Sequence, residues 1–187
     1  MELSLVLQFK SVGEDLCQNR LVSAHGGNLS VRIGDRLVIT RHACALGRLA
    51  EADLVEASLD PRGLADALAS MEVAVHRAIY CLTDAGAIVH AHPAHAIALS
   101  LKARKIVPAD VEGSVLLGRV LVVGWGRRLR PGGGAEVVAR ALRKSRVVMV
   151  HGHGCFAVGK NLEEACGYVT TLEESCRILY LLKDLAP

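Results

Sequence analysis

Four of the chain's eight histidines form two closely spaced pairs. In the first pair, His90 and His92 follow the apolar run Gly86–Val89, and if that run is a strand, both imidazoles project from the same face. Two imidazoles on one face suit a divalent cation, and catalytic zinc usually has three protein ligands and one open position. The pair therefore predicts a metal site that needs one more ligand.

The second pair, His151 and His153, follows another apolar run, Val147–Val150. Its neighbouring glycines would let the backbone turn sharply enough to direct a side chain back across the sheet. Either histidine could supply the third ligand. The alternative is that both pairs are interior histidines with hydrogen-bond partners, or part of a solvated loop.

Glu72 precedes a helical pattern, where the helix dipole favours an ionised carboxylate. Such a group could act as an acid or base, or lend an oxygen to the metal, although an ordinary helix-terminal glutamate fits the spacing equally well. His76 and His95 fall within helical stretches. We expect them in the core or in support of the ligands, and not bound to metal.

Two segments could bind an anion. The loop Ser23–Ser30 offers backbone N–H groups and the side chain of Asn28 to an oxyanion, but a simple turn explains it as well. Arg127, Arg128 and Arg130 precede a glycine run at an expected helix start, where phosphate could bind, although a charge run is usually a solvated face.

Apolar periodicity and turn residues indicate which elements carry these groups. In chain order they predict a helix, three strands, a helix, a strand, a helix, two strands divided by a helix, and a final helix: Ser4–Arg20; Leu29–Ile33, Leu37–Thr40 and Leu54–Leu59; Met71–Leu82; Ala87–Val89; a segment after Pro93; Val120–Val123; Pro131 to about Lys144; Val147–Val150; Asn161 to about Lys183. The first two strands would form a hairpin at Gly34-Asp35. This order suits an α/β fold, a layered α/β/α domain with a largely antiparallel or mixed central sheet, and we expect residues 1–187 to form this single domain.

Composition narrows the function classes. A net charge of +3 is too small for a nucleic-acid binder, and no apolar stretch is long enough to cross a membrane. The N-terminus lacks secretory features, so we expect a cytoplasmic protein, with its six scattered cysteines as buried thiols. A hydrophobic content of 51% with few aromatic residues predicts apolar surface hidden between subunits.

Taken together, the motifs resemble the class II aldolase/adducin family. The resemblance covers nearly the whole chain and is carried, in order, by Gly26–Arg32, Glu72 with His76, His90-Ala91-His92, His153-Gly154 and Gly159–Ala165. It implies that His90, His92 and His153 bind zinc, or another divalent transition metal, and that Glu72 shuttles protons. His151 falls outside the family pattern.

The resemblance also implies an activity: reversible retro-aldol cleavage of a small ketose phosphate, similar to fuculose 1-phosphate, into dihydroxyacetone phosphate and a short aldehyde. No Schiff-base lysine is needed. It further implies a four-fold symmetric homotetramer. The alternatives are a sugar-phosphate 4-epimerase, dehydratase or decarboxylase of the same family, a structural metal site, or a non-catalytic module like the adducin head, which lacks the metal histidines.

The expected substrate and phosphate site matches the family only in part. Gly27 and Asn28 match its loop, whereas His42-Ala43, beside Arg41, replaces a threonine-glycine pair, and Ser70-Met71 replaces a serine pair. Arg41 or His42 could supply charge-assisted hydrogen bonds instead, or the substrate could lack this phosphate. A tyrosine that some members contribute from a neighbouring subunit has no counterpart near Pro108.

Overall fold

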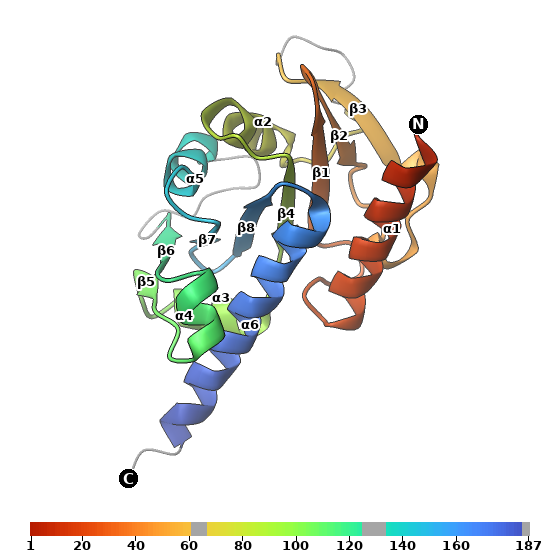
Figure 1. The fold of residues 1–187 in the computed structure, drawn as a ribbon. Helices are drawn as coiled ribbons and strands as arrows, with labels where there is room; N and C mark the ends of the chain where they lie inside the picture. The colour runs from red at the N-terminus through yellow and green to blue at the C-terminus, as the bar shows by residue number, and fades with distance from the viewer. Residues whose placement is uncertain (61–66, 125–133, 185–187) are drawn as a thin grey trace.

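The computed structural model describes residues 1–60, 67–124 and 134–184 (Figure 1). The helices are α1 (Leu3–Gln18), α2 (Val73–Leu82), α3 (Ala94–Ser100), α4 (Val111–Leu116), α5 (Ala135–Leu142) and α6 (Leu162–Asp184), with short 3₁₀ turns η1 (Leu46–Arg48) and η2 (Glu51–Asp53). The strands are β1 (Asn28–Ile33), β2 (Arg36–Thr40), β3 (Leu54–Ser58), β4 (Ala87–Ala91), β5 (Lys105–Ile106), β6 (Val120–Val123), β7 (Val147–Val150) and β8 (Gly154–Gly159).

The strands form one eight-stranded sheet in the order β3-β2-β1-β4-β8-β7-β6-β5. Neighbouring strands run antiparallel except β6 and β7, which run parallel. Gly34 forms the β1–β2 turn with φ +61°, a conformation that glycine adopts without strain. The predicted α/β fold with a largely antiparallel sheet is therefore confirmed.

Helices cover both faces of the sheet, and the alternation of side chains along β4 shows how. Ala87, Val89 and Ala91 lie in the core shared with α1, α3 and α6, whereas Ile88 lies in the core shared with α2 and α5. Helices α2 and α5 lie next to each other on that second face (Figure 1). The result is the expected three-layer arrangement, with His90 on the face that α2 and α5 cover.

Some elements differ from the sequence prediction. The strands β5 and β8 and the helix α4 were not predicted, because β5 and α4 are short and β8 begins and ends with glycine. Helix α2 begins at Val73 and not at Met71, since a turn precedes it in which the Val73 N–H donates to the Ser70 carbonyl over 3.0 Å. The predicted helix start at Pro131 and the arginines Arg127, Arg128 and Arg130 lie outside the described residues.

The cysteine prediction was partly wrong. Cys155, Cys166 and Cys176 are buried, but Cys17 and Cys81 are exposed, because each lies on the outward side of an amphipathic helix. Among the described residues, no helix combines the length and apolar character needed to cross a membrane.

Candidate active site

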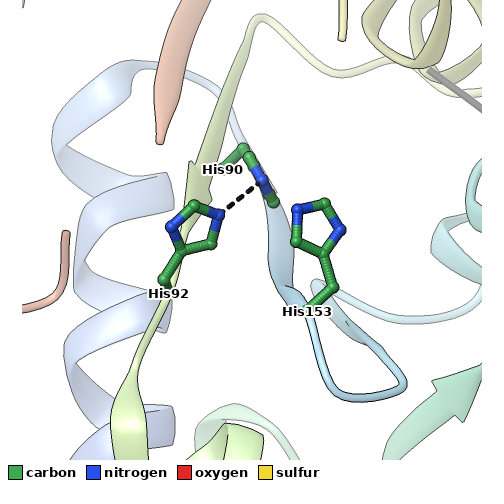
Figure 2. A group of neighbouring side chains, drawn as sticks. All are labelled: His90, His92 and His153. Carbon is green, nitrogen blue, oxygen red and sulfur yellow. Dashed lines mark hydrogen bonds between the residues drawn. The ribbon is translucent and has the colours of Figure 1, made fainter. Parts of the chain in front are cut away.

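Three histidines meet at one end of the sheet. His90 is the penultimate residue of β4, and His92 follows the last. Strand β8 pairs with both β4 and β7, which places the three-residue β7–β8 turn beside the end of β4, and His153 is the last residue of that turn. The ligand-type atoms of His90, His92 and His153 all lie within 4.8 Å of one another, and the three rings converge (Figure 2).

The geometry of this cluster fits a divalent cation. The His90 and His92 Nε2 atoms are 3.1 Å apart, close to the roughly 3.3 Å expected between two nitrogens bound to tetrahedral zinc at about 2.0–2.1 Å. The Nδ1–H of His90 donates to the Cys155 carbonyl over 2.9 Å, so its Nε2 lone pair faces the cluster. Stacking on Phe156, with ring centroids 4.2 Å apart, also fixes the His90 ring.

Burial keeps His90 and His92 in the protonation state that binds metal. Desolvation, reinforced by His92 and His153, lowers the pKa of His90 well below its usual value. Desolvation and the nearby His153 lower the pKa of His92 to about 4. Both imidazoles are therefore neutral near pH 7 and need not lose a proton to bind a cation.

Gly154 allows β8 to approach the cluster closely. A Cβ atom at this position would press against the Ala91 carbonyl oxygen and would lie 2.6 Å from Cδ2 of His92 and 3.2 Å from Cε1 of His90. Any larger residue would therefore displace two of the three rings. The second glycine of the His151–Gly154 segment is needed for this contact.

A cavity of about 150 Å³ opens over the three histidines, and Glu72 lines it with them. Glu72 is only 6% exposed and occupies the N-cap position of α2, where the helix dipole favours a carboxylate. The sequence-predicted substrate residues line the same cavity: Gly27, Asn28, Arg41, His42 and Ser70. His25 and Met71 also line it and were not predicted.

Backbone pairing brings the anion-binding candidates to the site. Asn28 pairs with His90 across β1 and β4, and Ser70 lies beside the end of β2 because its N–H donates to the Thr40 carbonyl over 3.1 Å. Gly27 has φ +76°, and a Cβ there would lie 2.8 Å from the His90 carbonyl oxygen. Glycine is thus required at the position that closes this loop over the histidines.

The segment that departs from the family pattern keeps a glycine-like backbone. Ala43 has φ +57°, an uncommon conformation for a residue with a side chain. Its carbonyl accepts a hydrogen bond from Nδ1–H of His25 over 2.9 Å, which joins the two loops at the mouth of the cavity. Arg41 and His42 are exposed beside it. Ala43 therefore stands in a backbone conformation that glycine would adopt without strain.

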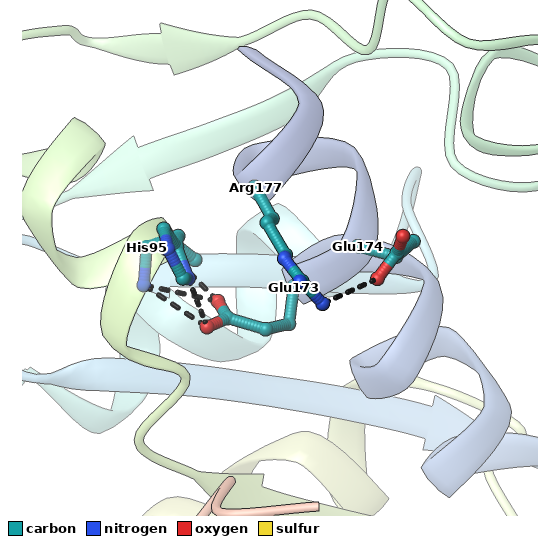
Figure 3. Close-up of polar contacts among 5 residues, drawn as sticks. His95, Glu173, Glu174 and Arg177 are labelled. Carbon is teal, nitrogen blue, oxygen red and sulfur yellow. Dashed lines mark hydrogen bonds and ion pairs between the residues drawn. The ribbon is translucent and has the colours of Figure 1, made fainter. Parts of the chain in front are cut away.

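The remaining histidines lie apart from the cluster. His76 is completely buried between α2 and β1. His95 bonds to Glu173, whose carboxylate also accepts from the backbone N–H groups of His95 and Ala96 (Figure 3). That pair lines a larger cleft of about 770 Å³, which contains none of the residues predicted for the site. His151 is not part of the cluster among the described residues.

Comparison with known proteins identifies the family. The family model of the class II aldolase and adducin N-terminal domain matches residues 8–180. The chain belongs to the class II aldolase and adducin family. A crystal structure of L-fuculose-1-phosphate aldolase from Thermus thermophilus is similar to this family member, with 40% sequence identity and a TM-score of 0.90, covering 100% of this chain and 99% of that one.

Curated relatives of this aldolase-family chain have more than one activity. An L-fuculose phosphate aldolase from Methanocaldococcus jannaschii is 30% identical over 93% of this chain and 94% of its own length. A 3-oxo-tetronate 4-phosphate decarboxylase from Pectobacterium atrosepticum is 29% identical over 92% of this chain and 82% of its own length. These matches confirm the prediction of a lyase. The family is metal-dependent, and the three-histidine cluster of this chain could bind a metal ion.

Proposed function

We propose that this protein is a zinc-dependent aldolase. It would reversibly cleave a small ketose phosphate, similar to fuculose 1-phosphate, into dihydroxyacetone phosphate and a short aldehyde. The observation that carries this proposal is one cavity that holds a three-histidine cluster, the buried carboxylate of Glu72 and the Gly27-Asn28 loop. The 40% identity to the Thermus thermophilus L-fuculose-1-phosphate aldolase supports the choice among family activities.

The donor set favours zinc as the metal. Three imidazole ligands suit zinc or a similar transition metal better than they suit magnesium or calcium, which prefer oxygen ligands. His90, His92 and His153 would hold the ion, and a three-ligand site leaves a position open, as catalytic zinc requires. When bound, the ion supplies the charge stabilisation that an enediolate needs.

Glu72 would transfer the proton. Its carboxylate lines the cavity beside the histidines and is 6% exposed, so a proton moves between it and the substrate with little competition from solvent. In the cleavage direction it would take up the proton of the substrate hydroxyl as the carbon–carbon bond breaks, and it would then return that proton to the enediolate carbon. In condensation the Glu72 carboxylate would carry out the same proton transfers in reverse order.

The substrate anion would bind to residues that line the same cavity as the three histidines. Gly27 and Asn28 offer a loop of N–H donors, Ser70 offers a hydroxyl, and Arg41 and His42 add charge or further donors. Arginine binds phosphate through two parallel hydrogen bonds, which would compensate for the family threonine that this chain lacks.

A decarboxylase is the second candidate. It is favoured by the similarity to the 3-oxo-tetronate 4-phosphate decarboxylase, which is nearly as close in identity as the archaeal aldolase. Both reactions break a carbon–carbon bond next to a carbonyl and leave an enolate-type anion. Product analysis distinguishes them, because only the decarboxylase releases carbon dioxide.

We also propose that residues 1–187 form one domain and that it works in the cytoplasm as a homotetramer. Large apolar side chains remain exposed on the single chain, and Val111 and Val115, one turn apart on α4, are 82% and 76% exposed. An interface between copies would cover them. Light scattering should give about 80 kDa, four chains of 19.9 kDa each, and a monomer would contradict the assembly.

The activity is tested with a screen of substrates on zinc-reconstituted protein. Phosphorylated and unphosphorylated ketoses are tested for cleavage, dihydroxyacetone phosphate is tested for condensation with short aldehydes, and 3-oxo acid phosphates are tested for release of carbon dioxide. Cleavage of a ketose 1-phosphate with dihydroxyacetone phosphate as product supports the proposal. Decarboxylation without any aldol reaction would replace it with the second candidate.

A further inference from the structure

A continuous line of buried hydrogen bonds leads from α2 to the side chain of Asn28. The Tyr80 hydroxyl lies 2.7 Å from Oγ of Ser30, Oγ of Ser30 lies 2.6 Å from Nδ1 of His76, and Nε2 of His76 lies 2.6 Å from Oδ1 of Asn28. Asn28 and Ser30 point from the same face of β1, and His76 and Tyr80 are one turn apart on α2. All four side chains are at most 5% exposed.

The phenol at the start of this line fixes the direction of every hydrogen bond in it. Among the described residues, the Tyr80 hydroxyl has Ser30 as its hydrogen-bond partner and no other. If Ser30 donated to it, the buried phenol hydrogen would have no acceptor, which is costly in a protein interior. Tyr80 therefore donates to Ser30. Within the part of the chain that the structure describes, Nδ1 of His76 is the remaining partner of Oγ of Ser30, so the Ser30 hydroxyl donates its hydrogen to Nδ1 of His76.

His76 passes the same direction on to Asn28. Burial lowers the pKa of His76 to about 3, so the ring is neutral and carries one N–H. Because Nδ1 accepts from Ser30, the proton lies on Nε2, and Nε2–H donates to Oδ1 of Asn28. The amide oxygen is thereby engaged on the α2 side, and the NH₂ group is what Asn28 offers to the cavity that it lines.

We propose that Tyr80, Ser30 and His76 are positioning residues that hold the Asn28 amide with its NH₂ toward the cavity, as a fixed donor to an anionic oxygen of the substrate. The anionic substrate rests on the proposed function, whereas the orientation of the amide rests on the hydrogen bonds alone. A side-chain amide that could rotate would also be able to present its oxygen to the anion. The buried line removes that alternative.

The first test measures the proton position directly. Long-range ¹H–¹⁵N correlation spectra of ¹⁵N-histidine-labelled, zinc-loaded protein should show His76 protonated on Nε2. In Tyr80→Phe the hydrogen bond between Ser30 and His76 can run in either direction, because no phenol donates to Ser30. The ¹⁵N chemical shifts of His76 should then move toward a mixture of the two tautomers. Tyr168→Phe removes the phenol of another tyrosine, which donates to Glu164 on α6, and it should leave the His76 signals unchanged. Protonation of His76 on Nδ1 in the unmodified protein would overturn the proposed orientation.

The second test uses inorganic phosphate as the probe, titrated calorimetrically into zinc-loaded protein. Asn28→Asp keeps an acceptor for His76 but turns an oxygen toward the cavity, so the Kd for phosphate should rise at least tenfold. Tyr80→Phe should raise it severalfold, and it should raise the substrate KM more than it lowers kcat. An unchanged phosphate Kd in Asn28→Asp would overturn the donor role. Phosphate binding that depends on Asn28 in a protein that cleaves no ketose phosphate would contradict the proposed function and support this inference.

Discussion

At the scale of single residues, the site separates metal binding from proton transfer. The three histidines are held by neighbouring strands, whereas Glu72 comes from the start of α2 on the same face of the sheet. The carboxylate can therefore be altered without removing a proposed ligand. This separation makes the two roles independently testable.

Replacing Glu72 by glutamine should abolish catalysis while zinc stays bound. Glutamine has nearly the same shape but cannot carry a proton between substrate atoms, and loss of a general acid or base typically lowers kcat about 10²- to 10⁴-fold. The measurements are kcat for ketose phosphate cleavage and zinc content by elemental analysis. The control is Glu136→Gln on α5, an exposed residue paired with Arg140. A kcat for Glu72→Gln within a few-fold of the parent would exclude the proposed role.

The two histidines of the β7–β8 turn provide a matched comparison. His153 belongs to the cluster and His151 does not, although only Gly152 separates them. His153→Ala should weaken zinc binding by about 100-fold or more, since loss of a residue that only hydrogen-bonds to a metal ligand already costs up to about 100-fold. His151→Ala should leave the zinc affinity nearly unchanged. Competition with a chromogenic chelator measures both affinities. Equal losses in the two variants would argue against the proposed ligand set.

At the scale of elements, the register of β4 and β8 determines whether the cluster forms. Gly154→Ala should disrupt zinc binding, because the added methyl group meets the Ala91 carbonyl and the His92 ring. Gly167→Ala is the same substitution on α6, with nothing within 4 Å of the new Cβ, and it should improve helix propensity by up to about 1 kcal/mol. Zinc stoichiometry and melting temperature distinguish the two variants. Full zinc occupancy in Gly154→Ala would show that the strands can separate without affecting the site.

The elements also show how far the sequence could be interpreted. The run ending at Val89 predicted that His90 and His92 share a face, because strand periodicity is strict. The sequence could not show that β8 pairs between β4 and β7, which is what brings His153 to them, since strand order depends on contacts between distant segments. The family motif selected His153 and not His151 as the third ligand, a choice that local spacing alone left open. The network at His76 was missed because each of its polar residues looks ordinary within its own element.

At the scale of the whole molecule, the site lies where both halves of the fold meet. The paired strands β4 and β8 lie at the centre of the sheet, with β1 to β3 on one side and β5 to β7 on the other. Residues from Gly27 to His153 therefore reach one cavity. Global unfolding would dismantle the site, so the pH dependence of stability also limits where the enzyme can work.

Protonation of His76 should make stability fall in acid. The pKa of His76 is about 3 in the folded chain, against an unperturbed value of 6.5. The unfolded chain therefore binds a proton at this residue below pH 6.5, whereas the folded chain binds it only below about pH 3. Stability from this residue is complete above pH 6.5 and is lost as the pH falls, by roughly 2 kcal/mol between pH 7 and pH 5.

Urea unfolding of the unmodified protein and of His76→Gln at both pH values measures this contribution, because both proteins keep His90 and His92. The variant should lose less stability over that interval, whereas His25→Gln, which changes an exposed histidine, should match the parent. Identical losses in all three proteins would mean that folded His76 is protonated at pH 5, and that its Nδ1–H donates to Ser30 at that pH.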